Sequence, residues 1–269
     1  MVDREPLRRV AVAAAAAAGA VVLRRADDSR ALRPEEKAAG DYVTAVDREA
    51  EAAAVDVLRR ETPDVAVLAE EAGGSRADRF WAVDPVDGTT NLVRSFPVVG
   101  VSVALVEDGR PVVAAVAAPH LGSSWSAVEG GGATDASGRP LRVGEQEPAR
   151  CVVATGFPFR RKDERTLARY LSVFMGALLR FEDLRRAGAA SLDLAYAASG
   201  TFDGFFELNL ALWDIAAGAL LVREAGGVVT DWTGREDAVF ESGNILAGSP
   251  RWHEAMLELT TAMLQSESP

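Results

Sequence analysis

The sequence predicts a mixed α and β protein made of two halves that meet near residue 145. In the first half, helical periodicity is followed by two alternating apolar segments around an Asp-Gly, which indicates helices with a mostly antiparallel sheet. In the second half, segments of helical and strand character alternate, which is typical of a layered α/β arrangement. We therefore predict an N-terminal α+β half over residues 1–145 and a C-terminal α/β half over residues 146–269.

Composition limits the classes of function. The 269 residues are 48% hydrophobic and 26% charged, an ordinary mixture for a globular protein with a sizeable core. The net charge of −11 argues against nucleic-acid binding, which requires a basic face. Cys151 is the only cysteine, so no internal disulfide can form, and a reducing, cytoplasmic location is expected. With only two histidines, any bound metal is expected to have oxygen ligands, as Mg²⁺, Mn²⁺ or Ca²⁺ does.

The N-terminal region, residues 4–25, predicts a first helix packed on the core. Its basic start and small residues loosely resemble a signal peptide. However, the apolar run is about 14 residues long and mostly Ala, too short and too weakly apolar to span a membrane. Because Ala is the best helix former, a soluble helix is the better interpretation, and no membrane association is expected.

Further elements of the first half follow from periodicity. Residues 46–60 predict a helix with charges opposite an apolar stripe of Val46, Ala53, Val57 and Leu58. Short apolar runs at 65–71 and 79–84 predict strands that end in acids, with a turn or flexible loop between them. Residues 98–119 predict a β-hairpin, and residues 123–143 predict further short strands with Gly-rich turns.

Eight elements are expected in the second half. Strands are predicted over 149–156, 202–208, 227–234 and 244–249, and helices over 166–181, 190–200, 212–227 and 249–267. The Gly-Gly pair at 226–227 is a helix stop signal.

Acidic residues gather at the ends of these elements. Asp84 and Asp87 flank an expected turn after a strand, Glu70 ends another strand, and Asp214 opens a helix. Each has a local explanation, because Asp-Pro and Asp-Gly favour turns and the helix dipole favours an N-terminal acid. Asp47 could likewise be a helix N-cap. These explanations weaken when all the acids are considered together.

Together, seven segments resemble the inositol monophosphatase family of Mg²⁺-dependent, Li⁺-sensitive sugar-phosphate phosphatases. The resemblance covers nearly the whole chain. It rests on DYVTAVD (41–47), LAEE (68–71), WAVDPVDGTTN (81–91), GFPF (156–159), RRAGAASLDLAY (185–196), DGFFELNLALWDIAAG (203–218) and EAGG (224–227). It implies an α+β fold built as a five-layer αβαβα sandwich of the inositol monophosphatase/fructose-1,6-bisphosphatase type, in a cytoplasmic homodimer.

The resemblance also implies two or three bound Mg²⁺ ions. Glu70, Asp84 and the backbone carbonyl of Val86 would hold the first ion. Asp84, Asp87 and Asp214 would hold the second, with Asp84 shared, and a weaker third ion would lie near Glu70. This agrees with the preference of Mg²⁺ for carboxylate and carbonyl oxygens. Phosphate-ester hydrolysis develops negative charge over several oxygens, which bound cations stabilise.

The catalytic residues implied by the resemblance are Glu70, Thr89 and Asp47. Thr89, oriented by Asp47, would accept the proton of a water that attacks phosphorus directly, without a phosphoenzyme. Gly88 and Thr89 would begin a short helix whose backbone N–H groups bind the phosphate, as helix N-termini bind anions. Thr44 is expected in a strand.

Substrate-binding positions follow from the same resemblance. Glu207 matches the acid that hydrogen-bonds inositol hydroxyls, and the pocket would be completed by Gly188, Ala189, Ala190 and Asp214. This sequence departs from the family pattern in three places. Ala189 replaces a common Ser or Thr, Ala211 a frequent His or Lys, and Asn209 a frequent Gly. Fewer polar side chains at the sugar rim weaken the prediction of strict inositol specificity.

The substrate alternatives are ranked by these features. Thr89-Thr90-Asn91 after Asp-Gly fits the inositol branch, so inositol-1-phosphate ranks first and broad sugar-phosphate activity second. Fructose-1,6-bisphosphate and histidinol phosphate follow. A hypothesis from another class is a transcription-associated regulatory protein, because some bacterial relatives act in transcription complexes. The acid residues favour a working enzyme.

Overall fold

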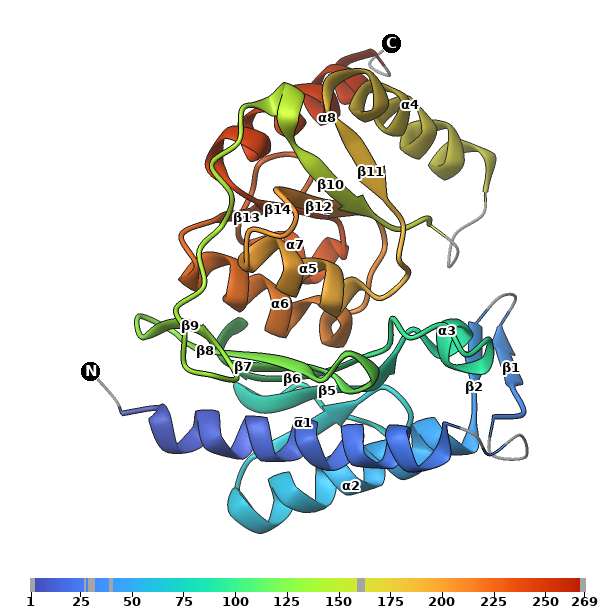
Figure 1. Ribbon diagram of the computed structural model, residues 1–269, viewed down its shortest axis with the longest axis vertical. Helices are drawn as coiled ribbons and strands as arrows, with labels where there is room; N and C mark the ends of the chain where they lie inside the picture. Colours follow the sequence, from blue (N-terminus) through green and yellow to red (C-terminus); the bar gives the residue numbers. More distant parts are fainter. Residues whose placement is uncertain (1–2, 27, 29–31, 39–40, 159–162, 267–269) are drawn as a thin grey trace.

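The computed structural model describes residues 3–26, 28, 32–38, 41–158 and 163–266. Its helices and sheets alternate in five layers, helix–sheet–helix–sheet–helix, as Figure 1 shows from bottom to top. The predicted αβαβα sandwich is therefore confirmed. Residue 267 of the predicted last helix lies outside the described residues.

The first layer is a pair of helices, α1 (Glu5–Arg25) and α2 (Ala45–Glu61), which pack on each other and on the first sheet. By length and composition alone α1 could cross a membrane. One of its faces nevertheless belongs to the core, through small residues such as Ala11, Ala14 and Ala18 that are fully buried. The predicted first helix is confirmed as a helix of the core.

The buried face of α2 differs from the prediction. Val46 and Leu58 are buried as expected, whereas Ala53 and Val57 are only half-buried. Asp47 and Glu51 lie on the buried face, although charges were expected on the opposite side. Both acids are hydrogen-bonded to backbone or side-chain donors, which allows their burial.

The second layer is a seven-stranded sheet. In the order of the sheet, its strands are β4 (Gly73–Gly74), β3 (Ala66–Ala69), β5 (Arg79–Asp87), β6 (Gly100–Glu107), β7 (Arg110–Ala118), β8 (Ser123–Val128) and β9 (Gly132–Asp135). Neighbouring strands are antiparallel except β3 and β5, which are parallel. The predicted hairpin is confirmed as β6–β7. A separate hairpin, β1 (Glu35–Ala38) with β2 (Asp41–Val43), lies beside the short helix α3 (Thr89–Val93).

Strand β5 corrects the expected turn between Asp84 and Asp87. Asp84 pairs with Ser102 and Asp87 with Gly100, so two residues of β5, Pro85 and Val86, oppose the single residue Val101 of β6. The strand therefore continues to Asp87 through a β-bulge. Pro85 has no N–H to contribute to a ladder, which fits a bulge position. A bulge re-aims the side chains beside it.

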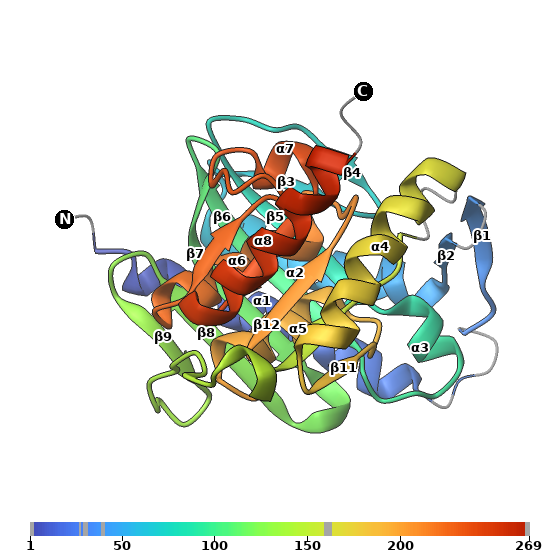
Figure 2. The ribbon, with the colours of Figure 1, turned by 90° about the horizontal axis from the view of Figure 1, so that it is seen from above.

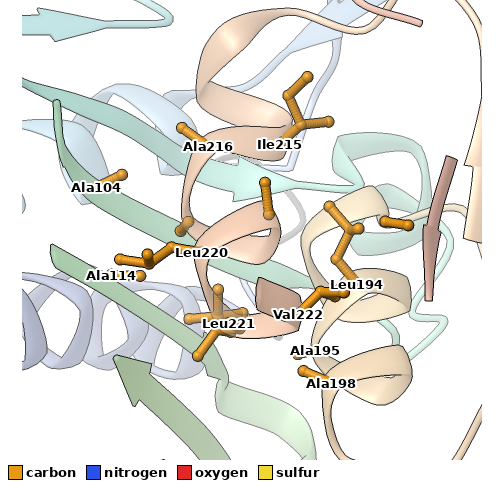
Figure 3. Packing of buried hydrophobic residues seen from close by; sticks show 14 of the residues in the cluster. Ala104, Ala114, Leu194, Ala195, Ala198, Ile215, Ala216, Leu220, Leu221 and Val222 are labelled. Carbon is orange, nitrogen blue, oxygen red and sulfur yellow. The ribbon is translucent and has the colours of Figure 1, made fainter. Parts of the chain in front are cut away.

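The middle layer consists of α5 (Ala190–Ala198) and α6 (Leu212–Glu224), packed between the two sheets. In Figure 3, Leu194 of α5 lies against α6, while Leu220 and Leu221 of α6 lie toward Ala114 of the first sheet. The two helices thereby join the halves of the molecule.

The fourth layer is a five-stranded sheet in the order β11 (Asp183–Arg185), β10 (Val152–Thr155), β12 (Gly204–Glu207), β14 (Ile245–Gly248), β13 (Val228–Thr230). Its outer face is covered by α4 (Glu164–Arg180) and α8 (Pro250–Ser266), which Figure 2 shows from above. The sequence did not predict β11, the short helix α7 (Val239–Ser242), or the 3₁₀ turns at Pro119–Leu121 and Pro148–Arg150.

The strands of the two sheets fall on either side of residue 145. However, α5 and α6 come from the second half and pack on the first sheet. The division into halves at 1–145 and 146–269 stays a prediction.

Candidate active site

Three acids converge on Asp84: Glu70 from the turn after β3, Asp87 from β5 and Asp214 from α6. Asp84 is 2% exposed within the bulge of β5, and one carboxylate oxygen accepts the backbone N–H of Val86 at 3.0 Å. Burial raises the pKa of Asp84 well above its ordinary value, and the negative charges of Glu70, Asp87 and Asp214 raise it further. The structure therefore brings Glu70, Asp84, Asp87 and Asp214 together.

Asp87 is held by the first turn of α5. Its Oδ2 accepts the backbone N–H of Ser191 at 2.7 Å and the Ser191 hydroxyl at 2.6 Å. Burial and then the charge of Asp214 raise the pKa of Asp87 to about 6, although these hydrogen bonds oppose the rise.

Asp214 belongs to the first turn of α6. Its Oδ2 accepts the backbone N–H of Ala211 at 2.8 Å, which fixes the carboxylate at the start of the helix. This single side chain therefore satisfies a helix N–H and contributes charge to the site.

The chemistry of these donors fits a hard divalent cation. Buried carboxylates that repel one another are stabilised when a cation lies between them, and oxygen ligands suit Mg²⁺. Within the described residues, no three His, Cys, Asp or Glu side chains form a ready-made metal-binding group. The donor set thus fits Mg²⁺ by type and burial, while the ligand assignments stay predictions.

A hydrogen-bond chain links Thr89 to α2. The Thr89 hydroxyl lies 2.7 Å from Asp47 Oδ1 and 3.2 Å from the Val86 carbonyl oxygen, so its proton is donated chiefly to Asp47. The other Asp47 oxygen accepts the N–H of Thr44 at 2.9 Å and its hydroxyl at 2.5 Å. Asp47 is thereby fixed in orientation with one oxygen directed at Thr89.

Thr44 corrects an expectation. It is the N-cap of α2 rather than a strand residue, and its hydroxyl accepts the N–H of Val46. Asp47, three residues later, completes the capping box. The cap gives the helix a defined start, which in turn positions Asp47.

The predicted phosphate and substrate segments lie side by side. Gly88 is the N-cap of α3 with φ 97°, a left-handed conformation that glycine adopts without strain. A Cβ on Gly88 would lie 3.2 Å from the Gly188 carbonyl oxygen, so the two segments approach closely. The Asn91 amide donates to the Ala187 carbonyl at 2.9 Å and holds them together. Ala189 and Ala190 follow at the buried start of α5.

Glu207 ends β12 on the same side of the molecule. Its carboxylate lies so close to Gly156 that any Cβ there would overlap it. Glu207 retains some exposed area, but burial raises its pKa well above the ordinary value, followed by the charges of Asp193, Asp214 and Asp87. Arg186 partly opposes this rise.

Several residues of the site were not predicted individually. Ser191, Arg186 and Asp193 lie within the RRAGAASLDLAY segment on which the resemblance rests, so their segment was found but not their roles. Asp193 is 1% exposed, and burial raises its pKa well above the ordinary value. Nothing in the sequence marked Glu51 as a buried residue of the site, because a Glu in a charged helix usually faces solvent.

Two surface cavities lie away from these residues. One, of about 320 Å³, lies between the start of α1 and the β8–β9 turn; the other, of about 280 Å³, lies near Arg150 and Glu182. Neither is lined by a predicted metal or substrate residue.

Comparison with known proteins agrees with this arrangement. The profile of the inositol monophosphatase family matches residues 3–265. The chain is 42% identical over 259 residues to the Nus factor SuhB of Pseudomonas aeruginosa, covering 94% of this chain and 95% of that protein. The structure of extragenic suppressor protein suhB from Bartonella henselae is similar at a TM-score of 0.88 and 35% identity, covering 94% and 98% of the two chains. Inositol monophosphatase from Anabaena (Nostoc) sp. PCC 7120 is similar at a TM-score of 0.84 and 32% identity, covering 98% and 97%. The resemblance inferred from the motifs is confirmed.

Proposed function

Because the chain belongs to the inositol monophosphatase family, we propose that it is a Mg²⁺-dependent phosphomonoesterase that hydrolyses myo-inositol-1-phosphate to inositol and phosphate. Family membership supports phosphatase activity and dependence on a metal in general. The substrate, the choice of Mg²⁺ and the roles of individual residues are parts of the proposal. The observation that carries it is the Asp47–Thr89 hydrogen bond beside the group of four acids, Glu70, Asp84, Asp87 and Asp214.

In this proposal Glu70, Asp84 and the Val86 carbonyl would hold one Mg²⁺, and Asp84, Asp87 and Asp214 would hold a second. A weaker third ion would bind near Glu70. When bound, the ions neutralise the phosphate charge and increase the acidity of the attacking water. The hydrogen bonds from Val86, Ser191 and Ala211 keep the three aspartates in place for this purpose.

The proton of the attacking water passes to Thr89. Since the Thr89 hydroxyl already donates to Asp47, its lone pairs are directed away from Asp47 and can accept that proton. The Thr89 proton moves to Asp47 Oδ1 in the same step. The water oxygen bonds to phosphorus while the P–O bond of the ester breaks. The departing alkoxide takes up a proton from solvent water to become the alcohol, and Asp47 returns its proton to solvent. Thr44 keeps Asp47 oriented throughout.

The sugar is recognised by Glu207 and by the segment of Gly188, Ala189 and Ala190, together with Asp214. Glu207 provides oxygens for the hydroxyl groups. Ala189 and Ala211 contribute no polar side chain for sugar hydroxyl groups. The alternatives within the phosphatases are therefore a broad sugar-phosphate phosphatase, a fructose-1,6-bisphosphatase and a histidinol-phosphate phosphatase. Asn209 adopts φ 61°, a left-handed backbone conformation that Asn tolerates better than most residues.

A substrate panel tests the proposal. Phosphate release is measured with Mg²⁺ from inositol-1-phosphate, fructose-1,6-bisphosphate, histidinol phosphate, NADP⁺ and phosphoadenosine phosphate. We expect inositol-1-phosphate to give the highest kcat/KM. A flat profile would support the broad phosphatase, and no release from any substrate would contradict the enzyme assignment.

A second candidate function is a regulatory role in transcription, which the name Nus factor of the 42% identical relative favours. Because the net charge is −11, we expect the chain to contact a protein of the transcription complex rather than RNA. Purified bacterial transcription factors can be tested for binding to the wild-type protein and to Asp87→Asn. Binding that survives this substitution would support a role independent of catalysis, and no binding by either protein would contradict it.

We also propose that the protein is a cytoplasmic homodimer. Cys151 is buried, and burial raises the pKa of its thiol to about 12, so it is an unreactive core residue. The cytoplasmic location is proposed because a chain with a single cysteine has no internal disulfide to maintain. On α4, Leu171, Met175 and Leu179 are 56%, 57% and 83% exposed, an apolar surface of the kind that a second copy would cover.

A further inference from the structure

The turn that carries Glu70 is held by a buried carboxylate from another layer of the molecule. Glu70, Glu71 and Ala72 connect β3 to β4. Glu51 of α2, which is 4% exposed, accepts the backbone N–H of Glu71 at 2.7 Å and that of Ala72 at 2.8 Å. Each Glu51 oxygen binds one of these N–H groups, so the side chain joins the turn to α2 at two points.

The same turn is fixed from the opposite side by β5. The N–H of Glu70 donates to the Val83 carbonyl at 3.1 Å, immediately before Asp84. Three successive amides are therefore hydrogen-bonded, one to β5 and two to Glu51. In β4, directly after the turn, Gly74 has φ 132°, and a Cβ there would clash with the Val67 carbonyl oxygen. The backbone that carries Glu70 consequently has little freedom relative to Asp84.

Helix α2 sets two parts of the site at once. Asp47 and Glu51 are one helical turn apart on the buried face of α2, and Asp47 holds Thr89. A buried carboxylate is costly unless hydrogen bonds compensate for its lost hydration, and each Glu51 oxygen is compensated by one amide of the turn. A buried glutamate at position 51 is explained if its role is to fix the position of the turn.

We propose that Glu51 is a positioning residue, which fixes the turn at Glu70–Ala72 so that the Glu70 carboxylate is placed for Mg²⁺ binding. Glu51 itself touches neither substrate nor metal in this proposal. The inference rests on the proposed function, because that function assigns Glu70 to Mg²⁺.

Two substitutions separate position from charge. Glu51→Gln keeps the length but replaces one acceptor oxygen with an NH₂ group, so one turn amide loses its partner. Glu51→Asp keeps the negative charge but is one methylene shorter, so it cannot reach both amides. If both variants behave alike, loss of charge is not the cause.

The chain offers a matched control in Glu224. Its two carboxylate oxygens accept the backbone N–H groups of Gly130 and Gly132, both at 2.8 Å, at the β8–β9 turn. Glu224→Gln breaks the same kind of contact at a turn without a predicted ligand. It therefore measures the general effect of loosening a turn.

Calorimetric titration with Mg²⁺ and hydrogen–deuterium exchange of the metal-free protein are the readouts. We expect both Glu51 variants to bind Mg²⁺ about 10-fold more weakly, the usual effect of losing a group that orients a ligand. Exchange at the amides of Glu71 and Ala72 should become roughly 10-fold faster. At saturating Mg²⁺, kcat should recover, because Glu70 is intact. Glu224→Gln should leave Mg²⁺ affinity unchanged.

Unchanged Mg²⁺ affinity in both Glu51 variants would overturn this inference and leave the proposed function standing. Equal weakening in the Glu51 and Glu224 variants would overturn it as well, because the effect would then be general. A wild-type protein that binds no Mg²⁺ would overturn the proposed function and this inference together.

Discussion

Asp87 and Asp214 reach the candidate site from different halves of the chain, and each is held by a hydrogen bond from backbone. Replacing either carboxylate by an amide preserves size but removes a charge that the proposed Mg²⁺ needs. We expect Asp87→Asn and Asp214→Asn to lower kcat/KM by more than about 100-fold while circular dichroism stays unchanged. Asp64→Asn, at an exposed position, is the control. Near-normal turnover in either site variant would disprove the ligand assignment.

Thr89 allows the proton-transfer role to be tested separately from Mg²⁺ binding. Thr89→Val keeps the shape but removes the hydroxyl that donates to Asp47, whereas Thr89→Ser keeps the hydroxyl. We expect Thr89→Val to lower kcat by about 10²–10⁴-fold and Thr89→Ser to retain most of it, with Mg²⁺ affinity similar in both. A Thr89→Val enzyme with normal kcat would exclude this path.

The raised pKa of Asp87, about 6, predicts a pH dependence. In the metal-free protein this carboxyl stays protonated to higher pH than in the unfolded chain, so the folded state binds more protons between about pH 4 and pH 6. Its contribution to stability is therefore lost as pH rises through about 6. Mg²⁺ competes with those protons, so we expect the Mg²⁺-induced rise in melting temperature to be larger at pH 7 than at pH 5. Thermal melts with saturating Mg²⁺ or a chelator test this, and an equal rise at both pH values would contradict it.

At the scale of elements, the close packing of α5 on α6 determines where two site residues lie, because α5 carries Ser191 and α6 carries Asp214. Gly218 makes this packing possible, since a Cβ there would overlap the side chain of Leu194 at its base. We expect Gly218→Ala to destabilise the protein by about 1–3 kcal/mol in denaturant unfolding, despite the helix propensity of Ala.

Gly176→Ala in α4 is the matched substitution. There a Cβ would meet only the tip of Leu259, at 3.0 Å, which can move. The gain in helix propensity, about 1 kcal/mol, should leave this variant neutral or more stable. If both variants were equally destabilised, the α5–α6 contact would not be the cause.

At the scale of the whole molecule, α4 presents the most exposed large apolar side chains of the described residues, with Leu179 83% exposed. If this face is covered by a second copy, wild type should have about twice the 28.4 kDa chain mass in light scattering after size exclusion. Leu179→Glu should shift it toward the monomer, because burying an unpaired charge is unfavourable. Glu182→Gln, at an already polar position, should not. A monomeric wild-type protein would disprove the dimer.

Much of the molecule was predictable because its information is local. The helices at α1, α5 and α6 and the β6–β7 hairpin follow from periodicity and turn residues within each segment. The acidic motifs were recognisable as a set, and their resemblance to one family predicted the five layers and the candidate ligands before any contact was known.

Tertiary contacts decided what local patterns could not. Asp47 and Glu51 can lie on the buried face of α2 because backbone N–H groups of residues 44, 71 and 72 replace the hydrogen bonds to water that these carboxylates lose. The turn expected at Asp84–Asp87 is a bulge because β6 pairs on both sides of it. A buried, hydrogen-bonded acid and a solvated one look alike in a sequence, since the difference is made by partners that the chain brings from far away.

The family, the order of most helices and strands, and the acids available to the site can therefore be recognised in the amino-acid sequence. The approach of Glu70, Asp87 and Asp214 to Asp84, and the hydrogen bonds from the Glu70 turn to Glu51, depend on how the layers pack. The physical reason is that a side chain's charge and hydration depend on its surroundings, and those surroundings exist only once the five layers have packed.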